Sequence, residues 1–154
     1  MTGPNGSLTV RLARPADAPR LAALLAAGSL RGTEDATDVP AYRSALDDIS
    51  GAPGNDVLVA ELDGEVVGVC QLVTFRHLQE RGGRCAEIES VHVAEGVRSS
   101  GIGGALVEAA VARAAAAGCY RVQLTSHKSR TAAHRFYVRH GFEATHEGFK
   151  RYLR

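Results

Sequence analysis

The sequence lacks several features that point to a specialised class of protein. Its 154 residues include only three cysteines, Cys70, Cys85 and Cys119, which are well separated and odd in number. Their spacing supports neither a disulfide framework nor a zinc site, and free thiols suit a reducing cytosol. No apolar run approaches the roughly 20 residues that cross a bilayer, and residues 1–10 lack the regions of a signal peptide. We therefore expect a soluble, cytoplasmic protein without a metal site.

An excess of charge is also lacking. The formal net charge is +1, from 18 Lys and Arg against 17 Asp and Glu, so no broad field for nucleic acid or a membrane is indicated. The content of 45% hydrophobic and 23% charged residues is typical of globular proteins and supplies a core. The length suits one compact domain. We expect a single domain over residues 1–154, with a loose tail at residues 1–6 and no nucleic-acid or membrane partner.

The periodicity of the apolar residues predicts a mixture of helices and strands. Asp63-Gly64 predicts a two-residue turn between two strands, which makes a β-hairpin. Strands are expected over residues 7–13, 57–62, 65–75, 84–94 and 120–126, with one or two more in 142–154. Helices are expected over residues 14–28, where Asp17 is a candidate cap, and over 39–50, 101–117 and 129–141. This order predicts an α/β or α+β layered fold.

A glycine-rich turn, RSSGIGG from Arg98 to Gly104, follows the strand of residues 84–94 and opens a helix. Glycine admits positive φ and close approach of a ligand to the backbone. The first amides of a helix are unpaired and lie at the positive end of its dipole, so they favour an anion. Arg98 adds a fixed positive charge. The turn has neither the Walker G-K-[ST] nor the G-x-G-x-x-G spacing, and a plain helix-capping loop is the alternative.

With Arg98 included, the turn reads R-x-x-G-x-G directly after a strand, which resembles the acetyl-CoA signature of the GNAT superfamily of N-acetyltransferases. A second landmark of that family, A-x-x-x-Y followed by G-F, has its counterpart in Ala133 to Tyr137 and Gly141-Phe142. The order of the predicted elements agrees over nearly the whole chain. The resemblance implies a central mixed, mostly antiparallel sheet of six to seven strands, flanked by about four helices. It also implies transfer of an acetyl group from acetyl-CoA to an amine, by direct attack in a ternary complex.

The resemblance further implies where acetyl-CoA binds. The pyrophosphate would lie on Arg98 and the amides of residues 99–104, and the pantetheine arm along residues 91–93. That strand is expected to splay from the strand at 120–126, so that the amide of Val91 or a neighbour faces the thioester oxygen as an oxyanion hole. His127 stands where many members carry Asn near the pantetheine arm, and its role is open. The residues expected to bind the cofactor are Val91, His92, Val93, Arg98, Ser99, Ser100, Gly101, Ile102, Gly103, Gly104, His127, Ala133 and Phe136.

Two glutamates on the same strand are candidates for proton transfer. Glu87 and Glu89 are two residues apart, which puts both carboxylates on one face of a strand. They lie eleven and nine residues before Arg98, and members of the family place a catalytic glutamate at either spacing. An acceptor amine with a pKa near that of lysine, ~10.4, arrives protonated and needs a base. Either glutamate is then the base, with the other binding the positive charge, or both are polar residues of an exposed face.

Tyr137 holds the position of the general acid in the resembled family. A phenol with a pKa of about 10 can protonate the leaving CoA thiolate, and the alternative is a buried aromatic on an amphipathic helix. His92 is expected to alternate away from the two glutamates and to pack under a helix.

The resemblance implies that residues 29–48 form the acceptor wall, as the corresponding segment usually does in that family. Its acidic residues suit a cationic acceptor, whereas Arg31 and Arg43 suit an acidic one; the acidic residues are Glu34, Asp35, Asp38, Asp47 and Asp48. Residues 125–142 and the chain end resemble small-molecule acetyltransferases, including the aminoalkylphosphonate type. The leading hypothesis is a small primary amine as acceptor. The alternatives are a protein or peptide acceptor, a non-catalytic acyl-CoA sensor and a nucleotide-binding regulatory domain, and a homodimer is considered because many members of the family dimerise.

Overall fold

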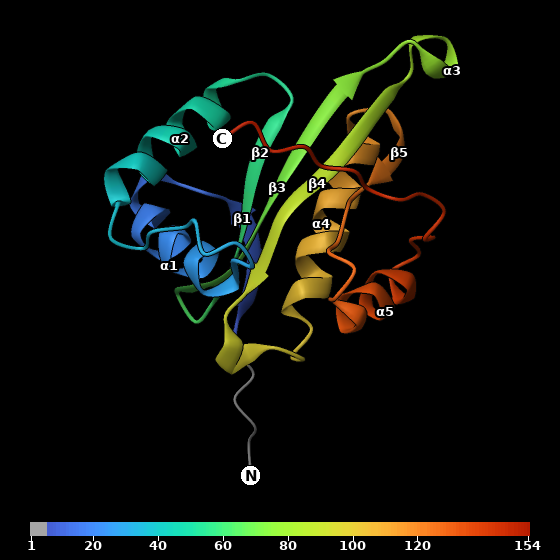
Figure 1. Cartoon of the computed structure of the whole chain (residues 1–154). Helices are drawn as coiled ribbons and strands as arrows, with labels where there is room; N and C mark the ends of the chain where they lie inside the picture. The colour runs from blue at the N-terminus through green and yellow to red at the C-terminus, as the bar shows by residue number, and fades with distance from the viewer. Residues whose placement is uncertain (1–5) are drawn as a thin grey trace.

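A five-stranded sheet forms the centre of the molecule (Figure 1). The computed structural model describes residues 6–154, so the expected loose tail of residues 1–6 lies outside it apart from Gly6. The strand order is β1-β2-β3-β4-β5, and all pairs are antiparallel except β4 with β5. The strands are β1 (Leu8–Leu12), β2 (Asn55–Leu62), β3 (Glu65–Arg76), β4 (Arg84–Val93) and β5 (Cys119–Gln123).

Helices lie on both faces of this sheet, which confirms the layered fold. Helices α1 (Ala18–Gly28) and α2 (Val39–Gly51) cover one face, and α4 (Ile102–Ala116) covers the other with α5 (Thr131–Arg139) beside it (Figure 1). A short turn labelled α3 (Gln79–Gly82) joins β3 to β4. Within residues 6–154 no helix is long and apolar enough to span a bilayer.

Each face of the sheet has its own apolar cluster, because side chains alternate between the two faces of a strand. The cluster under α4 contains the largest fully buried side chains of the helix, Leu106 and Val107, against Leu72 of β3. The second cluster joins the sheet to α1 and α2; its buried members are Leu21, Leu24, Leu46, Val57, Val59, Val66 and Val69.

The predicted hairpin between β2 and β3 is confirmed. Asp63 and Gly64 connect Leu62 to Glu65 and have φ values of 51° and 84°. Positive φ at both central residues is the geometry of a type I′ turn, whose twist matches that of the flanking strands.

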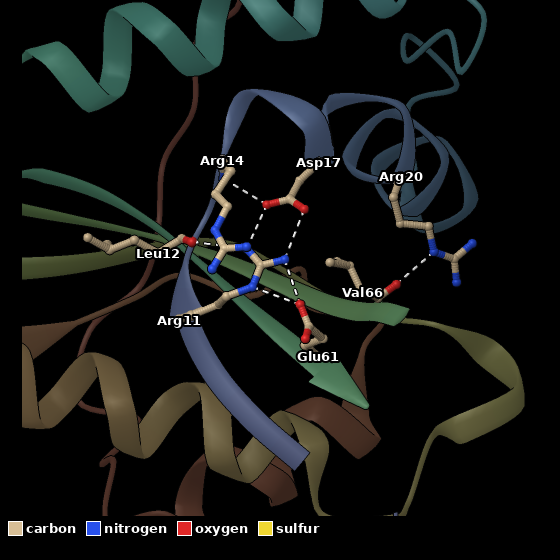
Figure 2. A network of polar contacts seen from close by, with 7 residues as sticks. All are labelled: Arg11, Leu12, Arg14, Asp17, Arg20, Glu61 and Val66. Atoms are coloured by element: carbon tan, nitrogen blue, oxygen red, sulfur yellow. Dashed lines mark hydrogen bonds and ion pairs between the residues drawn. The ribbon is translucent and has the colours of Figure 1, made fainter. Parts of the chain in front are cut away.

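Arg11 on β1 fastens the sheet to the segment that leads into α1 (Figure 2). Its guanidinium donates to both carboxylate oxygens of Asp17, at 2.8 and 3.0 Å, and its Nε donates to Glu61 Oε2 at 2.8 Å. Asp17 also accepts from the Arg14 amide at 2.7 Å. The hydrogen bond from Arg11 is the main reason why the pKa of Asp17 lies below its ordinary value. Asp17 therefore precedes α1 as expected, but its carboxylate makes no cap to that helix.

The C-terminal segment corrects the expected number of strands. Residues 142–154 contain no strand, so the sheet has five strands rather than six or seven. The apolar residues Phe149, Tyr152 and Leu153 do not alternate with a period of two, and Phe149 and Leu153 are about nine-tenths exposed, at 91% and 90%. The segment instead passes across the sheet toward α2 (Figure 1), where the Arg31 guanidinium lies over the Tyr152 ring at 3.7 Å from its centroid.

Candidate active site

Strand β4 has partner strands on both sides only in its first part. It pairs with β5 from Arg84 to Glu87, and the last pair is Glu87 with Gln123. Pairing with β3 continues to Val93. In the described part of the chain, no strand therefore pairs with the second edge of β4 beyond Glu87. This separation of β4 from β5 is the one that the resemblance implies.

A β-bulge at Ser90 changes which way the side chains of β4 point. Ser90 has φ of 54°, and the register with β3 shifts between Val69 and Gln71, so that two residues of β4 stand opposite Cys70. Such an extra residue reverses the alternation that follows it. The β3 partners of Glu87, Glu89 and His92 are Val73, Gln71 and Val69, respectively. Since these partners alternate along one strand, all three β4 side chains lie on one face, that of α1 and α2.

The expectation that His92 points away from the glutamates is therefore wrong, because the sequence does not reveal the bulge. His92 packs against the end of α1, where a Cβ on Gly28 would lie 2.0 Å from His92 Nδ1. Burial is the main cause that lowers the pKa of His92, and the charges of Arg130 and Arg98 lower it further against an opposing effect of Glu34. His92 is thus neutral at pH 7, and its contact with the cofactor stays a prediction.

Glu87 and Glu89 differ in their surroundings. Glu87 Oε2 accepts a hydrogen bond of 2.9 Å from Gln123 Nε2 across the last β4–β5 pair. The pKa of Glu89 is raised, first by desolvation and then by the charge of Glu87 and a hydrogen bond between the two carboxyl groups, while Lys150 opposes the rise. Glu89 therefore takes up a proton more readily than an ordinary carboxylate, as a general base requires.

Gln123 and Lys150 are residues of this site that sequence reasoning missed. Gln123 was expected only as part of a strand, and nothing but the β4–β5 register places it beside Glu87. Lys150 comes from the segment that was expected to form strands.

The glycine-rich turn leads from β4 into α4. After the 3-10 turn of Glu95–Val97, Arg98 Nε donates to Val93 O at 3.3 Å and Ser100 Oγ donates to Val97 O. Gly101 is the residue before α4, with φ of 83°, and a Cβ on it would meet no atom within 4 Å. The left-handed backbone therefore favours glycine at this position. Residues 98–101 are exposed, and the first amides of a helix have no partner within it, but the binding of an anion here stays a prediction.

Gly103 and Gly104 have a packing role that the sequence did not indicate. A Cβ on Gly103 would approach Phe136 to 3.4 Å, and one on Gly104 would approach His140 Cε1 to 2.9 Å. His140 Nδ1 also lies 3.0 Å from Glu108 Oε1 of α4. The two glycines therefore let α5, which carries Tyr137, approach the start of α4.

Tyr137 lies half-buried on α5 with its ring edge-to-face against Phe136 and Phe142, at centroid distances of 5.1 and 5.8 Å. Burial is the main cause that raises its pKa, and the charge of Arg130 opposes the rise. The phenol therefore carries its proton at neutral pH and is able to donate it. Arg130 also donates to Gly28 O at 2.7 Å, so it links the start of α5 to the end of α1.

The comparisons with known proteins agree with this geometry. The family model described as acetyltransferase (GNAT) family matches residues 25–142, which is more than half of the chain. This protein belongs to the GNAT acetyltransferase family. It is therefore an acetyl-CoA-dependent N-acetyltransferase.

Three solved structures show the extent of the similarity to this GNAT enzyme. A transcriptional regulator from Bacillus halodurans C-125 is 35% identical, with a TM-score of 0.91 over 96% of this chain and 100% of that one. A proposed acetyltransferase from Agrobacterium tumefaciens is 28% identical, with a TM-score of 0.85 over 94% and 99%. Glucosamine-6-phosphate N-acetyltransferase from Arabidopsis thaliana, 18% identical over 96% and 99%, shares the fold with a TM-score of 0.81. No curated protein matches the sequence.

Two histidines of this GNAT enzyme, His127 between β5 and α5 and His134 on α5, contact the loop that joins these elements. His127 Nδ1 accepts from the Ser129 amide at 3.1 Å and lies 2.8 Å from Ser129 Oγ. His134 Nε2 lies 2.9 Å from His127 O. His127 Nδ1 is therefore occupied, and only Nε2 is available to a ligand. Its place beside the pantetheine arm stays a prediction, as does that of Ala133.

Proposed function

We propose that this GNAT enzyme transfers the acetyl group of acetyl-CoA to a primary amine of a small molecule by direct attack in a ternary complex. The observation that carries the proposal is the pair of Glu87, which is bound by Gln123, and Glu89, whose pKa is raised. The pair lies where β4 loses its pairing with β5. An amine that is protonated in solution needs a base at this place, and the thioester needs an open strand edge beside it.

The cofactor lies along the end of β4 and the start of α4. Arg98 and the amides of residues 99–104 hold the pyrophosphate, and the pantetheine arm follows residues 91–93. The side chains of Val91 and Val93 pack into the cluster under α4. Packing of this kind fixes their backbone, so that the amide of Val91 faces the thioester oxygen without reorganisation during the reaction.

The reaction moves protons as well as the acetyl group. Glu89, whose pKa is raised, takes a proton from the bound ammonium, while Glu87 provides the negative charge that holds the amine. The free amine attacks the thioester carbon, the C–N bond forms, the C–S bond breaks, and the nitrogen gives up its second proton to water. Tyr137 then donates its proton to the CoA thiolate and is reprotonated from solvent. A base is most effective when its pKa is near the working pH, which favours Glu89 over an ordinary carboxylate.

In the structure, the acidic residues between α1 and α2 give weaker support for a cationic acceptor than the sequence suggested. Three of its acidic residues are engaged locally: Glu34 accepts from the Tyr42 hydroxyl, Asp35 binds Thr37, and Asp38 caps α2 through the Ala41 amide. The charge that attracts the amine comes instead from β4. The resemblance of the last helix and chain end to aminoalkylphosphonate acetyltransferases supports testing amines that carry an acidic group.

A non-catalytic acyl-CoA sensor is the second candidate, because the 35% identical protein of Bacillus halodurans is described as a transcriptional regulator. Tyr137 and the glutamate pair favour catalysis over sensing. A sensor would bind acetyl-CoA and release no thiol with any acceptor.

A thiol-release screen with acetyl-CoA tests the proposal. The panel contains aminoalkylphosphonates, amino sugars, polyamines, amino-acid amides and peptides with free N-termini. Release with a small amine, lost in the double variant Glu87→Gln and Glu89→Gln, supports the proposal. Release with peptides alone makes the enzyme a protein acetyltransferase, and tight acetyl-CoA binding without release from the whole panel favours the sensor.

A further inference from the structure

Gln123 stands at the boundary between the paired and unpaired parts of β4. It is the last residue of β5 and the partner of Glu87, in the last pair before the strands separate. Both polar atoms of its side-chain amide have a partner. Nε2 donates to Glu87 Oε2 at 2.9 Å, and Oε1 lies 3.6 Å from the thiol of Cys85. Cys85 is fully buried, so this end of the contact is fixed by the core.

A second glutamine, Gln71 of β3, lies on the same face of the sheet. Gln71 of β3 stands opposite Glu89 in the register, as Gln123 stands opposite Glu87. Among the described residues, however, Gln71 donates to neither glutamate, whereas Gln123 binds Glu87. The two glutamates therefore have neighbours of the same kind but only Glu87 is anchored.

Anchoring Glu87 has a consequence for Glu89. Without a partner, a half-buried carboxylate turns toward water, away from a like charge. The hydrogen bond from Gln123 keeps the Glu87 carboxylate beside Glu89, where its charge raises the pKa of Glu89. The other charged group that acts on Glu89 is Lys150 of the C-terminal segment, and His92 shares the face as a neutral side chain.

We propose that Gln123 is a positioning residue, which holds Glu87 against Glu89 and thereby makes Glu89 the base of the pair. The inference rests on the proposed function, in which this pair accepts the proton of the amine. Gln123 touches neither substrate nor cofactor in this role. It acts only through Glu87.

The test is a titration of the Glu89 carboxyl group in the full-length protein, followed by NMR with carboxyl-labelled glutamate and no cofactor. Gln123→Met keeps the length of the side chain and removes the donor. We expect the pKa of Glu89 to fall by about one unit, the usual spread of carboxyl values among folded proteins. The acid limb of the pH profile of kcat/KM should move to lower pH by the same amount. The matched control, Gln71→Met, should leave the pKa of Glu89 in place.

Glu87→Gln shows whether the effect passes through Glu87. This variant should lower the pKa of Glu89 by itself, and adding Gln123→Met to it should cause no further fall, because the two changes act on one interaction. An unchanged pKa of Glu89 in a folded Gln123→Met protein would overturn the proposal, as would an equal fall in Gln71→Met. The titration needs no acceptor, so its failure is distinct from a failure of acetyl transfer.

Discussion

The two halves of the site are built in different ways. The donor region consists of the turn of residues 98–104 and the start of α4, which are contiguous in the sequence. The acceptor region consists of Glu87, Glu89, Gln123 and Lys150, which come from β4, β5 and the C-terminal segment. The donor region acts through backbone amides and one fixed charge, whereas the acceptor region acts through side chains whose proton affinities depend on one another.

This difference separates the effects that substitutions should have. Changes in the donor region should alter the affinity for CoA and leave the proton chemistry unaffected. Changes in the acceptor region should alter kcat and its pH dependence and leave the affinity for CoA unaffected. A residue that changed both would show that the two regions are not independent.

Glu89→Gln should have the largest effect, because it removes the proposed base. We expect kcat/KM to fall by about 10²- to 10⁴-fold, the usual contribution of a general base, with an unchanged Kd for acetyl-CoA. Steady-state kinetics and calorimetry measure the two quantities. The control is Glu65→Gln at the hairpin, where the carboxylate is exposed and 3.7 Å from Arg20. A Glu89→Gln enzyme that keeps most of its activity would contradict the assignment of the base.

The same variant should be more stable than the natural protein above the pKa of Glu89. A carboxyl group whose pKa is higher in the folded than in the unfolded protein favours the folded state at pH values below its pKa in the unfolded protein. It opposes folding as the pH rises through its pKa in the folded protein. Removing the charge should therefore raise the free energy of unfolding at pH 8 by roughly 0.2–1 kcal/mol, the range for partly exposed charges. Urea denaturation at pH 8 and pH 3.5 measures this gain, which should vanish at the lower pH.

Tyr137→Phe should have the next largest effect. The variant removes only the hydroxyl, and we expect kcat to fall by about 10²-fold with little change in the Kd for acetyl-CoA. Tyr120→Phe is the matched control, because its hydroxyl contacts His77 at 2.8 Å away from the site. The clearest measurement uses an acceptor amine for which protonation of the CoA thiolate is the rate-limiting step. Full activity in Tyr137→Phe would mean that another group, such as water, protonates the thiolate.

The contrast between the two regions also explains what the sequence could predict. The turn, its helix, the Asp63-Gly64 hairpin and the A-x-x-x-Y helix depend on neighbouring residues, and the structure has all of them within a few residues of their expected places. The layered fold followed from their order. These features are local, so propensities and spacings contain the information.

The features that were missed depend on contacts between distant segments. The bulge at Ser90 needs no glycine, so it left no signal, and it reversed the expected direction of His92. Only the parallel register of β5 with β4 places Gln123 beside Glu87. The C-terminal segment was expected to add strands from its aromatic residues, but its apolar residues lack strand periodicity and one of them meets Arg31 instead.

Arg98→Glu tests the donor region in isolation. Loss of a charge-assisted hydrogen bond costs about 1.5–3 kcal/mol, so the Kd for CoA should rise by about 10- to 100-fold, while the acid limb of the pH profile stays in place. Arg76→Glu is the control, since Arg76 lies at the end of β3 opposite the beginning of β4, away from the turn. An unchanged Kd in calorimetry would contradict the assignment of the pyrophosphate to this turn.

The smallest effect is expected at the contact that holds the C-terminal segment, and it tests whether the acceptor region extends to that segment. Arg31 lies between α1 and α2, and its contact with Tyr152 keeps Lys150 near the glutamate pair. An exposed cation–π contact contributes about 0.5–1 kcal/mol, so Tyr152→Ala should lower the KM of a cationic amine by up to about 2- to 5-fold, because the charge of Lys150 then opposes its binding less. Phe149→Ala is the matched control, because Phe149 is an aromatic of the same segment that is 91% exposed. Equal KM values for the two variants would confine the acceptor region to the sheet. A rise in the Kd for CoA would instead mean that the segment also supports the donor region.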